Sequence, residues 1–338
     1  MKVGVVMDLV NQSYLPDYAI DYLIHLEKKG RKPSTIKRYT YDLAIFFKWT
    51  KKKNKEELTF DQWRQLTLEE YDEFFNFLKN EKEYSDKTLH KMFVILKRMS
   101  LYFNSLNKVA TIPELLIELT DTQGKVLSEK DLISNKEFIK LIESMKSYEN
   151  LSENQLKIRD LILDRNLSLV YMMYYEGLTI SELTSIQMID INFIQNTLIV
   201  GQDRGNVRKL VLPAWRKQQY YKYYKTIPEA VRPKMYSDEP FYCSFFSKLN
   251  TYKYVYEGLV PIRPKDLTEV SIQRMLQKEV KRAGLRKGIS PQNFRNTAIV
   301  NSILKGDSES ETMINFGLES EYSYKRYLKY VRSLKEAE

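Results

Sequence analysis

The sequence predicts a mainly α-helical protein with two domains, of which the second is α+β and carries a small antiparallel sheet. Apolar side chains recur every three or four residues through the N-terminal third of the chain, which is the periodicity of amphipathic helices. Strand-like segments at 197–200 and 209–212 flank Gly205 and Asn206, which are typical hairpin turn residues. A chain of 338 residues is also longer than one hydrophobic core usually supports, so we expect two domains.

The composition favours a polyanionic partner. With 54 Lys and Arg against 44 Asp and Glu, the chain has a formal net charge of +10, which suits binding to nucleic acid. The single cysteine, Cys243, rules out an internal disulfide and a multi-cysteine metal site, and it is typical of a reducing compartment. The sequence has no glycine-rich phosphate loop, so it gives no support for nucleotide hydrolysis and we expect no cofactor.

Nothing in the sequence predicts export or membrane insertion. No apolar run approaches the roughly 18 to 20 residues that span a bilayer. The N-terminal MKVGVVMDLV lacks the apolar core and cleavage site of a signal peptide. We therefore expect a cytoplasmic protein without a membrane partner.

Histidine is confined to the first third of the chain. His25 and His90 are the only two, so no imidazole occurs from Lys91 onward. Any mechanism in the second domain that needs a histidine acid, base or metal ligand is therefore excluded, unless another domain donates the residue.

A bundle of four helices is predicted over residues 14–110, after a loose arm at 1–13. The expected helices are the segment 14–29 and three that begin at the capping residues Ser34, Thr67 and Ser85. Thr67 and Glu70 have the spacing of a capping box. The aromatic residues on one face of each helix are expected to form the core.

A linker is predicted at 111–135, where the periodicity weakens, so the second domain covers 136–338. Its helix at 160–176 is apolar on nearly all sides and is expected to lie in the centre of the core. Another helix is expected at 270–283. The segment 220–256 is dense in Tyr and Lys, and the sequence assigns it no role.

The stretch KPSTIKRYTYDLAIFFKW, residues 32–49, resembles the SAM-like core-binding domain of tyrosine recombinases, the phage integrase family. That domain follows a Ser-x-x-Thr-Ile-x-x-Tyr-x-x-Asp-Leu-x-x-Phe pattern. In the family two of its helices rest in the major groove of DNA. The resemblance implies that Lys37, Arg38, Lys87 and Lys91 face phosphates or base edges, and simple surface charge is the alternative for each.

The stretch YYEGLTISELTSIQMIDINF, residues 174–193, resembles a second signature of the family, Thr-Gly-Leu-Arg-Ile-Ser-Glu-Leu followed by Asp-Ile. Most positions agree, but Thr179 stands where the family has its first catalytic arginine. A neutral hydroxyl cannot give the bidentate, charge-neutralising contact that a guanidinium gives to a phosphate.

The segment from Ser290 to Tyr330 resembles the closing signature of the family, Pro-His-x-x-Arg-His, then Leu-Gly-His, then the nucleophilic Tyr. Arg295 and Tyr327 stand at the family interval. Gln292 and Leu318, however, replace histidines. The chain thus keeps the spacing of the signature, while residues that the family uses in catalysis are replaced.

The predicted hairpin is where the family carries a lysine that acts as general acid. Here the candidate is Arg204, with Gln202 as the alternative if the loop is aligned differently. Arginine holds its proton too tightly to be an efficient acid near neutral pH, although it remains a good phosphate ligand.

The resemblance therefore implies a tyrosine-recombinase fold without recombinase activity, in which no residue of the old catalytic set is expected to be active. Its implied role is sequence-specific binding of double-stranded DNA. Beside the four cations of the first domain, the expected DNA contacts are Arg204, Arg208, Arg286, Lys287 and Arg295.

As a regulator, the chain resembles the recombinase-fold master repressors of SPβ-type Bacillus prophages, which implies transcriptional repression in a phage or mobile element of a bacterial host. Two alternatives stay open. One is an active recombinase with an atypical site that uses Tyr327, and the other is an accessory DNA-binding factor in recombination. A homodimer and a protein or peptide antagonist are compatible with each of these roles.

Overall fold

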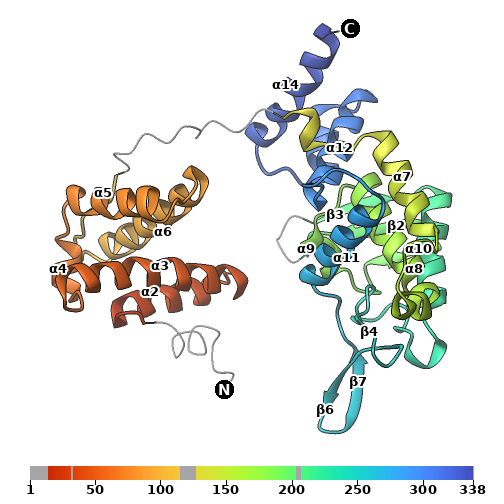
Figure 1. The fold of residues 1–338 in the computed structure, drawn as a ribbon, viewed down its shortest axis with the longest axis horizontal. Helices are drawn as coiled ribbons and strands as arrows, with labels where there is room; N and C mark the ends of the chain where they lie inside the picture. Colours follow the sequence, from red (N-terminus) through yellow and green to blue (C-terminus); the bar gives the residue numbers. More distant parts are fainter. Residues whose placement is uncertain (1–13, 32, 115–126, 203–206, 338) are drawn as a thin grey trace. The chain divides into compact units, whose positions relative to one another are not determined.

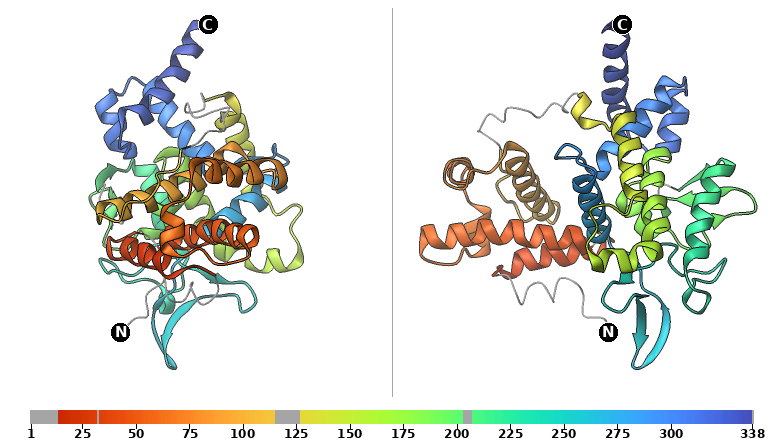
Figure 2. Two further views of the ribbon diagram at one scale, coloured as in Figure 1. Left: turned by 90° about the vertical axis from the view of Figure 1, so that its left-hand side faces the viewer. Right: turned by 45° about the vertical axis from the view of Figure 1, so that its right-hand side comes forward.

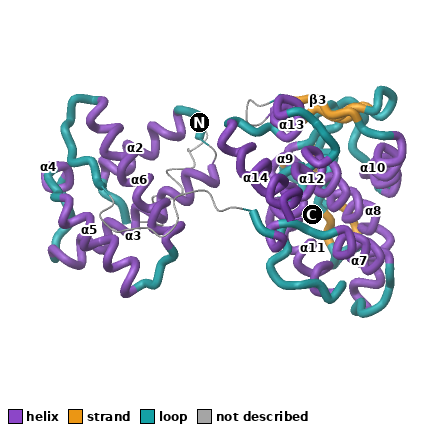
Figure 3. Tube along the Cα trace, turned by 90° about the horizontal axis from the view of Figure 1, so that it is seen from above, coloured by secondary structure: helices purple, strands orange, loops and turns teal. Residues whose placement is uncertain are grey.

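The computed structural model describes residues 14–31, 33–114, 127–202 and 207–337. The chain divides into two compact units, Met1–Gly124 and Lys125–Glu338, which are described separately here. Helices make up most of each unit (Figure 3), and the strands form small antiparallel sheets, which confirms the predicted fold class. The predicted arm at 1–13 lies outside the described residues, as does Arg204.

The first unit is a helical bundle (Figure 1). Its elements are α2 (Asp17–Lys28), α3 (Pro33–Asn54), α4 (Phe60–Arg64), α5 (Leu68–Asn76), which continues as the π-helical turn Phe77–Glu81, and α6 (Asp86–Ser105). Large aromatic side chains fill its centre, among them Trp63, Tyr71 and Phe74, each of which is buried. The aromatic faces seen in the sequence are therefore core, as expected.

Side-chain caps fix the starts of α4 and α5, whereas Ser85, predicted to cap α6, stands at its N-cap position without a side-chain cap bond. The capping box at Thr67 is confirmed, because its hydroxyl accepts from the Glu70 amide and its own amide donates to the Glu70 carboxylate. Ser34 was expected to cap α3, but it lies inside the helix, which begins at Pro33. Proline suits the first helical position because its φ is already helical and its missing N–H would have no partner there.

The second unit combines helices with short strands. Its helices are α7 (Asn135–Lys146), α8 (Glu153–Tyr175), α9 (Ile180–Ser185), α10 (Ala214–Thr226), α11 (Glu269–Arg282), α12 (Pro291–Leu304), α13 (Glu309–Phe316) and α14 (Glu321–Ala337). Its strands are β1 (Ile191–Asn192), β2 (Thr197–Val200), β3 (Arg208–Val211), β4 (Phe245–Phe246), β5 (Thr251–Tyr252), β6 (Tyr254–Glu257) and β7 (Val260–Pro264). The hairpin β6–β7 projects from the body of this unit (Figure 2).

Helix α8 is the centre of the second unit, as its apolar sequence predicts. Every residue from 165 to 174 is buried, and α10 and α12 both pack against the helix. The predicted hairpin is present as β2 and β3, in a sheet of order β1-β2-β3 in which Val200 lies opposite Arg208. Strand β3 begins one residue earlier than expected, which places Arg208 within it.

The predicted linker at 111–135 is longer than the structure supports. Residues 127–135 pack on the second unit, where Leu127 and Leu132 are buried and the Ile133 amide donates to the Thr297 hydroxyl at 2.9 Å. Residues 115–126 of the predicted linker lie outside the described residues. Within the described ranges, no helix is both long enough and apolar enough to cross a membrane.

Candidate functional site

Arg295 lies on α12 and joins the loop before α9 to the C-terminal end of α13. Its side chain is 11% exposed, and its Nη1 donates to the Gly177 carbonyl at 2.6 Å while Nη2 donates to the Phe316 carbonyl. Gly177 has a φ of +63°, and a Cβ at this position would lie 2.6 Å from the Phe316 ring. Glycine is therefore required on both conformational and steric grounds, and the loop before α9 can approach α13 closely enough for one guanidinium to bind both.

Glu182 on α9 is the anionic centre of the site. Its Oε1 accepts from Arg208 Nη1 at 2.6 Å, and its Oε2 lies 3.8 Å from Arg295 Nη1. Burial by itself would raise the pKa of the Glu182 carboxyl, but the bond and charge of Arg208, the Thr179 amide and the charge of Arg295 together lower it. The carboxylate is therefore ionised and holds the two guanidiniums inside the protein.

Thr179, at the position of the first family arginine, serves as the N-cap of α9. Its hydroxyl donates to Glu182 Oε2 at 2.9 Å and accepts from the Glu182 amide at 3.2 Å, which completes a capping box. Both hydrogen-bonding functions of the hydroxyl are thus used within the helix start.

Tyr327 on α14 is buried, with 4% of its surface exposed. Its Oη donates to Asn296 Oδ1 at 3.0 Å, and its ring packs in a cluster that includes Ile299 and Val331. Burial raises the pKa of the Tyr327 phenol, and the charges of Arg326 and Arg295 oppose this only in part. The neutral, hydrogen-bonded phenol is therefore favoured over the phenolate that a nucleophile requires.

Asn296, like Glu182, is a residue of the site that the sequence analysis did not single out. Its Oδ1 also accepts from Gln292 Nε2 at 2.8 Å, and its Nδ2 donates to the Asp131 carbonyl at 2.9 Å. The available signal was its position directly after Arg295, where the family signature has a second histidine. Asn296 joins Gln292 and Tyr327 into one amide-centred network.

Leu318, at the remaining histidine position, has no polar side chain to offer this network. It packs, partly buried, against the apolar cluster that also holds Tyr327. The structure thus links Gln292 and Tyr327 through Asn296, and it places Thr179 and Arg295 beside the Glu182 carboxylate.

Besides Arg295, two further predicted DNA contacts, Arg208 and Arg286, are bound by other groups of the second unit, and of these two only Arg208 is buried. The Arg208 side chain is 3% exposed and donates to the Asn315 carbonyl at 2.8 Å in addition to its pair with Glu182. It points inward because residues of β3 alternate between buried and exposed. Arg286 donates to Glu137 at 2.8 Å and to the carbonyls of Lys130 and Leu132.

These bonds hold the segment before α7 against the body of the unit, so Arg286 has a structural role in the fold. Lys287 beside it is exposed and remains a predicted DNA contact.

The first unit presents its predicted cations on the surface. Lys37 and Arg38 on α3 are exposed, as are Lys87 and Lys91 on α6. Burial raises the pKa of Asp42, while Arg38 and Lys91 both act to lower it, so cations of the two helices lie near one carboxylate. Arg38 and Lys91 therefore lie close together, and the four exposed cations Lys37, Arg38, Lys87 and Lys91 are together called the α3/α6 face below.

Relatives of this chain were found by sequence. No family model matches it. The chain is 23% identical over 279 residues to the tyrosine recombinase XerC of Lactobacillus delbrueckii subsp. bulgaricus, with 81% of this chain and 82% of that protein covered. It is 24% identical over 203 residues to the TnP I resolvase of Bacillus thuringiensis, with 58% of this chain and 62% of that resolvase covered. The match thus spans less than two thirds of the resolvase.

Solved structures share the fold. The XerH site-specific recombinase bound to a palindromic difH substrate has a TM-score of 0.67 at 16% identity, covering 98% of this chain and 86% of that chain. A λ integrase dimer bound to a COC′ core site has a TM-score of 0.59 at 14% identity, covering 93% and 94%. These similarities show that the chain has the fold of the tyrosine recombinases (integrases), and the signatures at residues 174–193 and 290–330 resemble those of that family.

Proposed function

We propose that the protein binds double-stranded DNA at specific sequences without cutting it, and that it represses transcription in a phage or other mobile element of a bacterial host. The observation that carries the loss of cutting is the state of the candidate nucleophile. Tyr327 is buried and donates to Asn296, and burial raises the pKa of its phenol.

The groups around Tyr327 support the same conclusion. Strand transfer needs preorganised cations at the phosphate and a proton donor for the leaving oxygen. Thr179, Gln292 and Leu318 are neutral, and Arg295 donates to two main-chain carbonyls. Because each lost charge-stabilising donor typically costs about 3 kcal/mol in the transition state, several losses at one site leave little rate.

DNA binding does not require the catalytic residues, and separate observations support it. Phosphate neutralisation supplies most of the affinity of a DNA-binding protein. The chain carries a net charge of +10, and the α3/α6 face presents Lys37, Arg38, Lys87 and Lys91 to solvent. The XerH and λ integrase structures of the same fold are described as DNA complexes.

The second candidate is an active recombinase with an atypical site. It is favoured by the retention of Arg295 and Tyr327 and by relatives named as a resolvase and a tyrosine recombinase. An accessory factor in recombination is the third. It differs from a repressor in where it binds, since its sites would lie at recombination ends and not at promoters.

The proposal is tested by gel shifts on fragments that tile the element that encodes the protein, with a promoter reporter for every bound fragment. We expect salt-sensitive binding at one or more promoters and lower reporter output when the protein is present. Binding confined to the ends of the element, without an effect on any reporter, would contradict repression and support the accessory role.

A further inference from the structure

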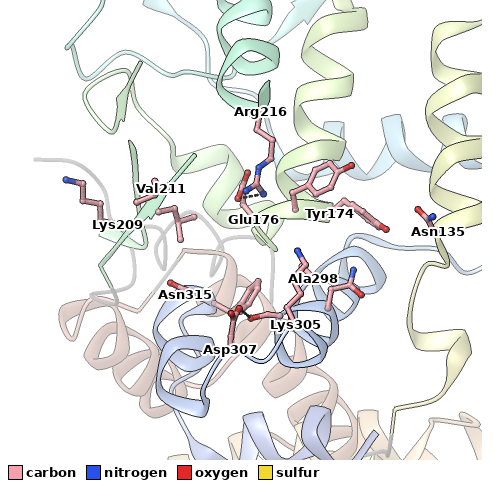
Figure 4. A pocket seen from close by; sticks show the side chains of 15 residues that line it. Asn135, Tyr174, Glu176, Lys209, Val211, Arg216, Ala298, Lys305, Asp307 and Asn315 are labelled. Carbon is pink, nitrogen blue, oxygen red and sulfur yellow. Dashed lines mark hydrogen bonds and ion pairs between the residues drawn. The ribbon is translucent and has the colours of Figure 1, made fainter. Parts of the chain in front are cut away.

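A groove on the second unit is not used by any of the proposed DNA contacts. A cavity of about 510 Å³ lies where the end of α8 meets β3, α12 and α13 (Figure 4). A neighbouring cavity of about 630 Å³ shares Asn135, Tyr174 and Asn301 with it. The two cavities therefore adjoin, and we call them together the α12 groove.

The polar side chains at one end of the α12 groove have few internal partners. Within the described ranges, no hydrogen bond or ion pair involves the side chains of Lys209, Lys305, Asn135, Asn301 or Asn315, all of which line the first cavity.

The acids that line the same cavity are occupied. Glu176 accepts from Arg216 at 3.0 Å and from Tyr220 at 2.9 Å, and Asp307 accepts from the Ser302 hydroxyl. The groups available to a ligand in this cavity therefore include two ammonium groups and three amides, while Glu129 is the acid that lines the neighbouring cavity.

The other end of the groove is more apolar. Leu132, Ile133, Val300 and Leu334 contribute to the walls of the second cavity. An amide side chain offers both donors and an acceptor, so it matches the peptide group of an extended chain, while a lysine matches a carboxylate. The cavity sizes fall within the range of about 300 to 1,000 Å³ that is typical of ligand sites.

We propose that the α12 groove binds an extended peptide segment of a partner protein that has apolar side chains and ends in a free, acidic C-terminus. Lys209 and Lys305 bind the carboxylates of the peptide, and the amides of Asn135, Asn301 and Asn315 bind its main chain. The apolar side chains of the peptide lie against Leu132 and Val300.

The walls of this groove also hold the candidate site together. Asn315 and Phe316 line the first cavity, and their main-chain carbonyls accept from Arg208 and Arg295. The Phe316 ring lies against Gly177. A peptide that moves Phe316 thus changes the loop before α9 as well, and we infer that peptide binding weakens DNA binding. This last step rests on the proposed function.

Direct binding is tested without DNA, by fluorescence anisotropy with fluorescein-Leu-Tyr-Leu-Asp-Asp-Glu that carries a free C-terminus. We expect saturable binding that weakens about tenfold in Lys305→Ala, in line with the loss of one charged contact, and several-fold in Asn301→Ala. Lys146→Ala, an exposed lysine on α7 away from the groove, is the matched control and should bind as the unmodified protein does. Circular dichroism of each variant confirms that it is folded.

Three results would overturn the proposal. The first is equal binding by all the variants. The second is equal competition by the same peptide with an amidated C-terminus. The third is tighter binding of the eight-residue peptide VRSLKEAE, the last residues of this chain, because it would assign the groove to a second copy.

The regulatory link has its own experiment, addition of the acidic peptide to a gel shift. We expect release of the DNA at peptide concentrations that saturate the groove, and no release from the Lys305→Ala variant. Bound peptide with an unchanged gel shift would reject the link to DNA binding while leaving the groove as a peptide site. Absence of any DNA binding in these gels would instead count against the proposed function.

Discussion

Two regions of the molecule hold cations that the family resemblance assigns to DNA: the α3/α6 face of the first unit, and the Glu182 centre of the second, formed by Glu182, Arg208 and Arg295. The cations of the first region are exposed, and those of the second are bound within the protein. Lys37, Lys87 and Lys91 are exposed to solvent. Arg208 and Arg295 are held by a buried carboxylate and by main-chain carbonyls. A motif position therefore predicts that a charge is kept, whereas only its surroundings decide whether the charge binds a ligand or stabilises the fold.

Removing Arg208 should give the largest effect on stability. Arg208→Ala leaves the Glu182 carboxylate buried without its closest cation, and breaking a buried ion pair in this way typically costs about 3 to 5 kcal/mol. Urea unfolding should show this loss, while Lys209→Ala, the exposed neighbour on β3, should change little. If Arg208→Ala unfolds like the unmodified protein but binds DNA weakly, Arg208 is a DNA contact and the comparison fails.

Removing two cations of the α3/α6 face should weaken DNA binding without destabilising the protein. Each phosphate contact contributes about 0.9 to the salt slope, so Lys87→Ala with Lys91→Ala should lower the slope by about 1.8 and weaken binding on the order of 100-fold at 0.1 M salt. Titrations at several salt concentrations measure both quantities. Lys82→Ala, which removes an exposed lysine outside this face, is the control. An equal loss of affinity in that variant would show that Lys87 and Lys91 contribute only general surface charge.

Acid should destabilise the second unit through Glu182, because the ion pairs of this carboxylate require its charged form. The folded-state pKa of Glu182 lies below its ordinary value of 4.5, so the unfolded chain takes up the proton first as the pH falls. The contribution of this carboxylate to stability is therefore full above about pH 4.5 and is lost as the pH falls through the lowered folded-state value. In Glu182→Gln the decline of unfolding free energy below pH 4.5 should be shallower, and an identical decline would assign the acid sensitivity to other carboxyls.

Tyr327→Phe should have the smallest effect. The variant loses one buried hydrogen bond, worth about 0.5 to 1.5 kcal/mol, while Asn296 Oδ1 still accepts from Gln292. Thermal unfolding should shift slightly, and gel shifts should give the same affinity as the unmodified protein. A large loss of affinity would place the phenol in contact with DNA.

Patterns that act over a few residues carried the fold prediction. The all-round apolar sequence of 160–176 predicted the central helix α8, and the spacing of Thr67 and Glu70 predicted a capping box. Strand phase was harder, because a shift of one residue exchanges the two faces of a strand. The prediction began β3 at 209, and the structure begins it at Arg208 with that side chain inward.

The roles of side chains with distant partners could not be predicted from local sequence. Arg286 pairs with Glu137, 149 residues earlier. Asn296 bonds to Tyr327, 31 residues later, and to the Asp131 carbonyl, 165 residues earlier. These contacts depend on how α12, α14 and the segment before α7 pack. Motif comparison brought Gln292, Arg295 and Tyr327 into view, but the packing decided what each of them binds.

The most direct test of the account is a search for a covalent protein–DNA adduct on a nicked suicide substrate that contains a sequence the protein binds in a gel shift. The unmodified protein and Tyr327→Phe are incubated with the substrate, denatured and separated by electrophoresis. The account predicts tight, salt-sensitive binding by both proteins and no adduct from either. A denaturant-resistant adduct that forms with the unmodified protein and is absent from Tyr327→Phe would contradict it, because it would show that the Glu182 centre still supports strand cleavage.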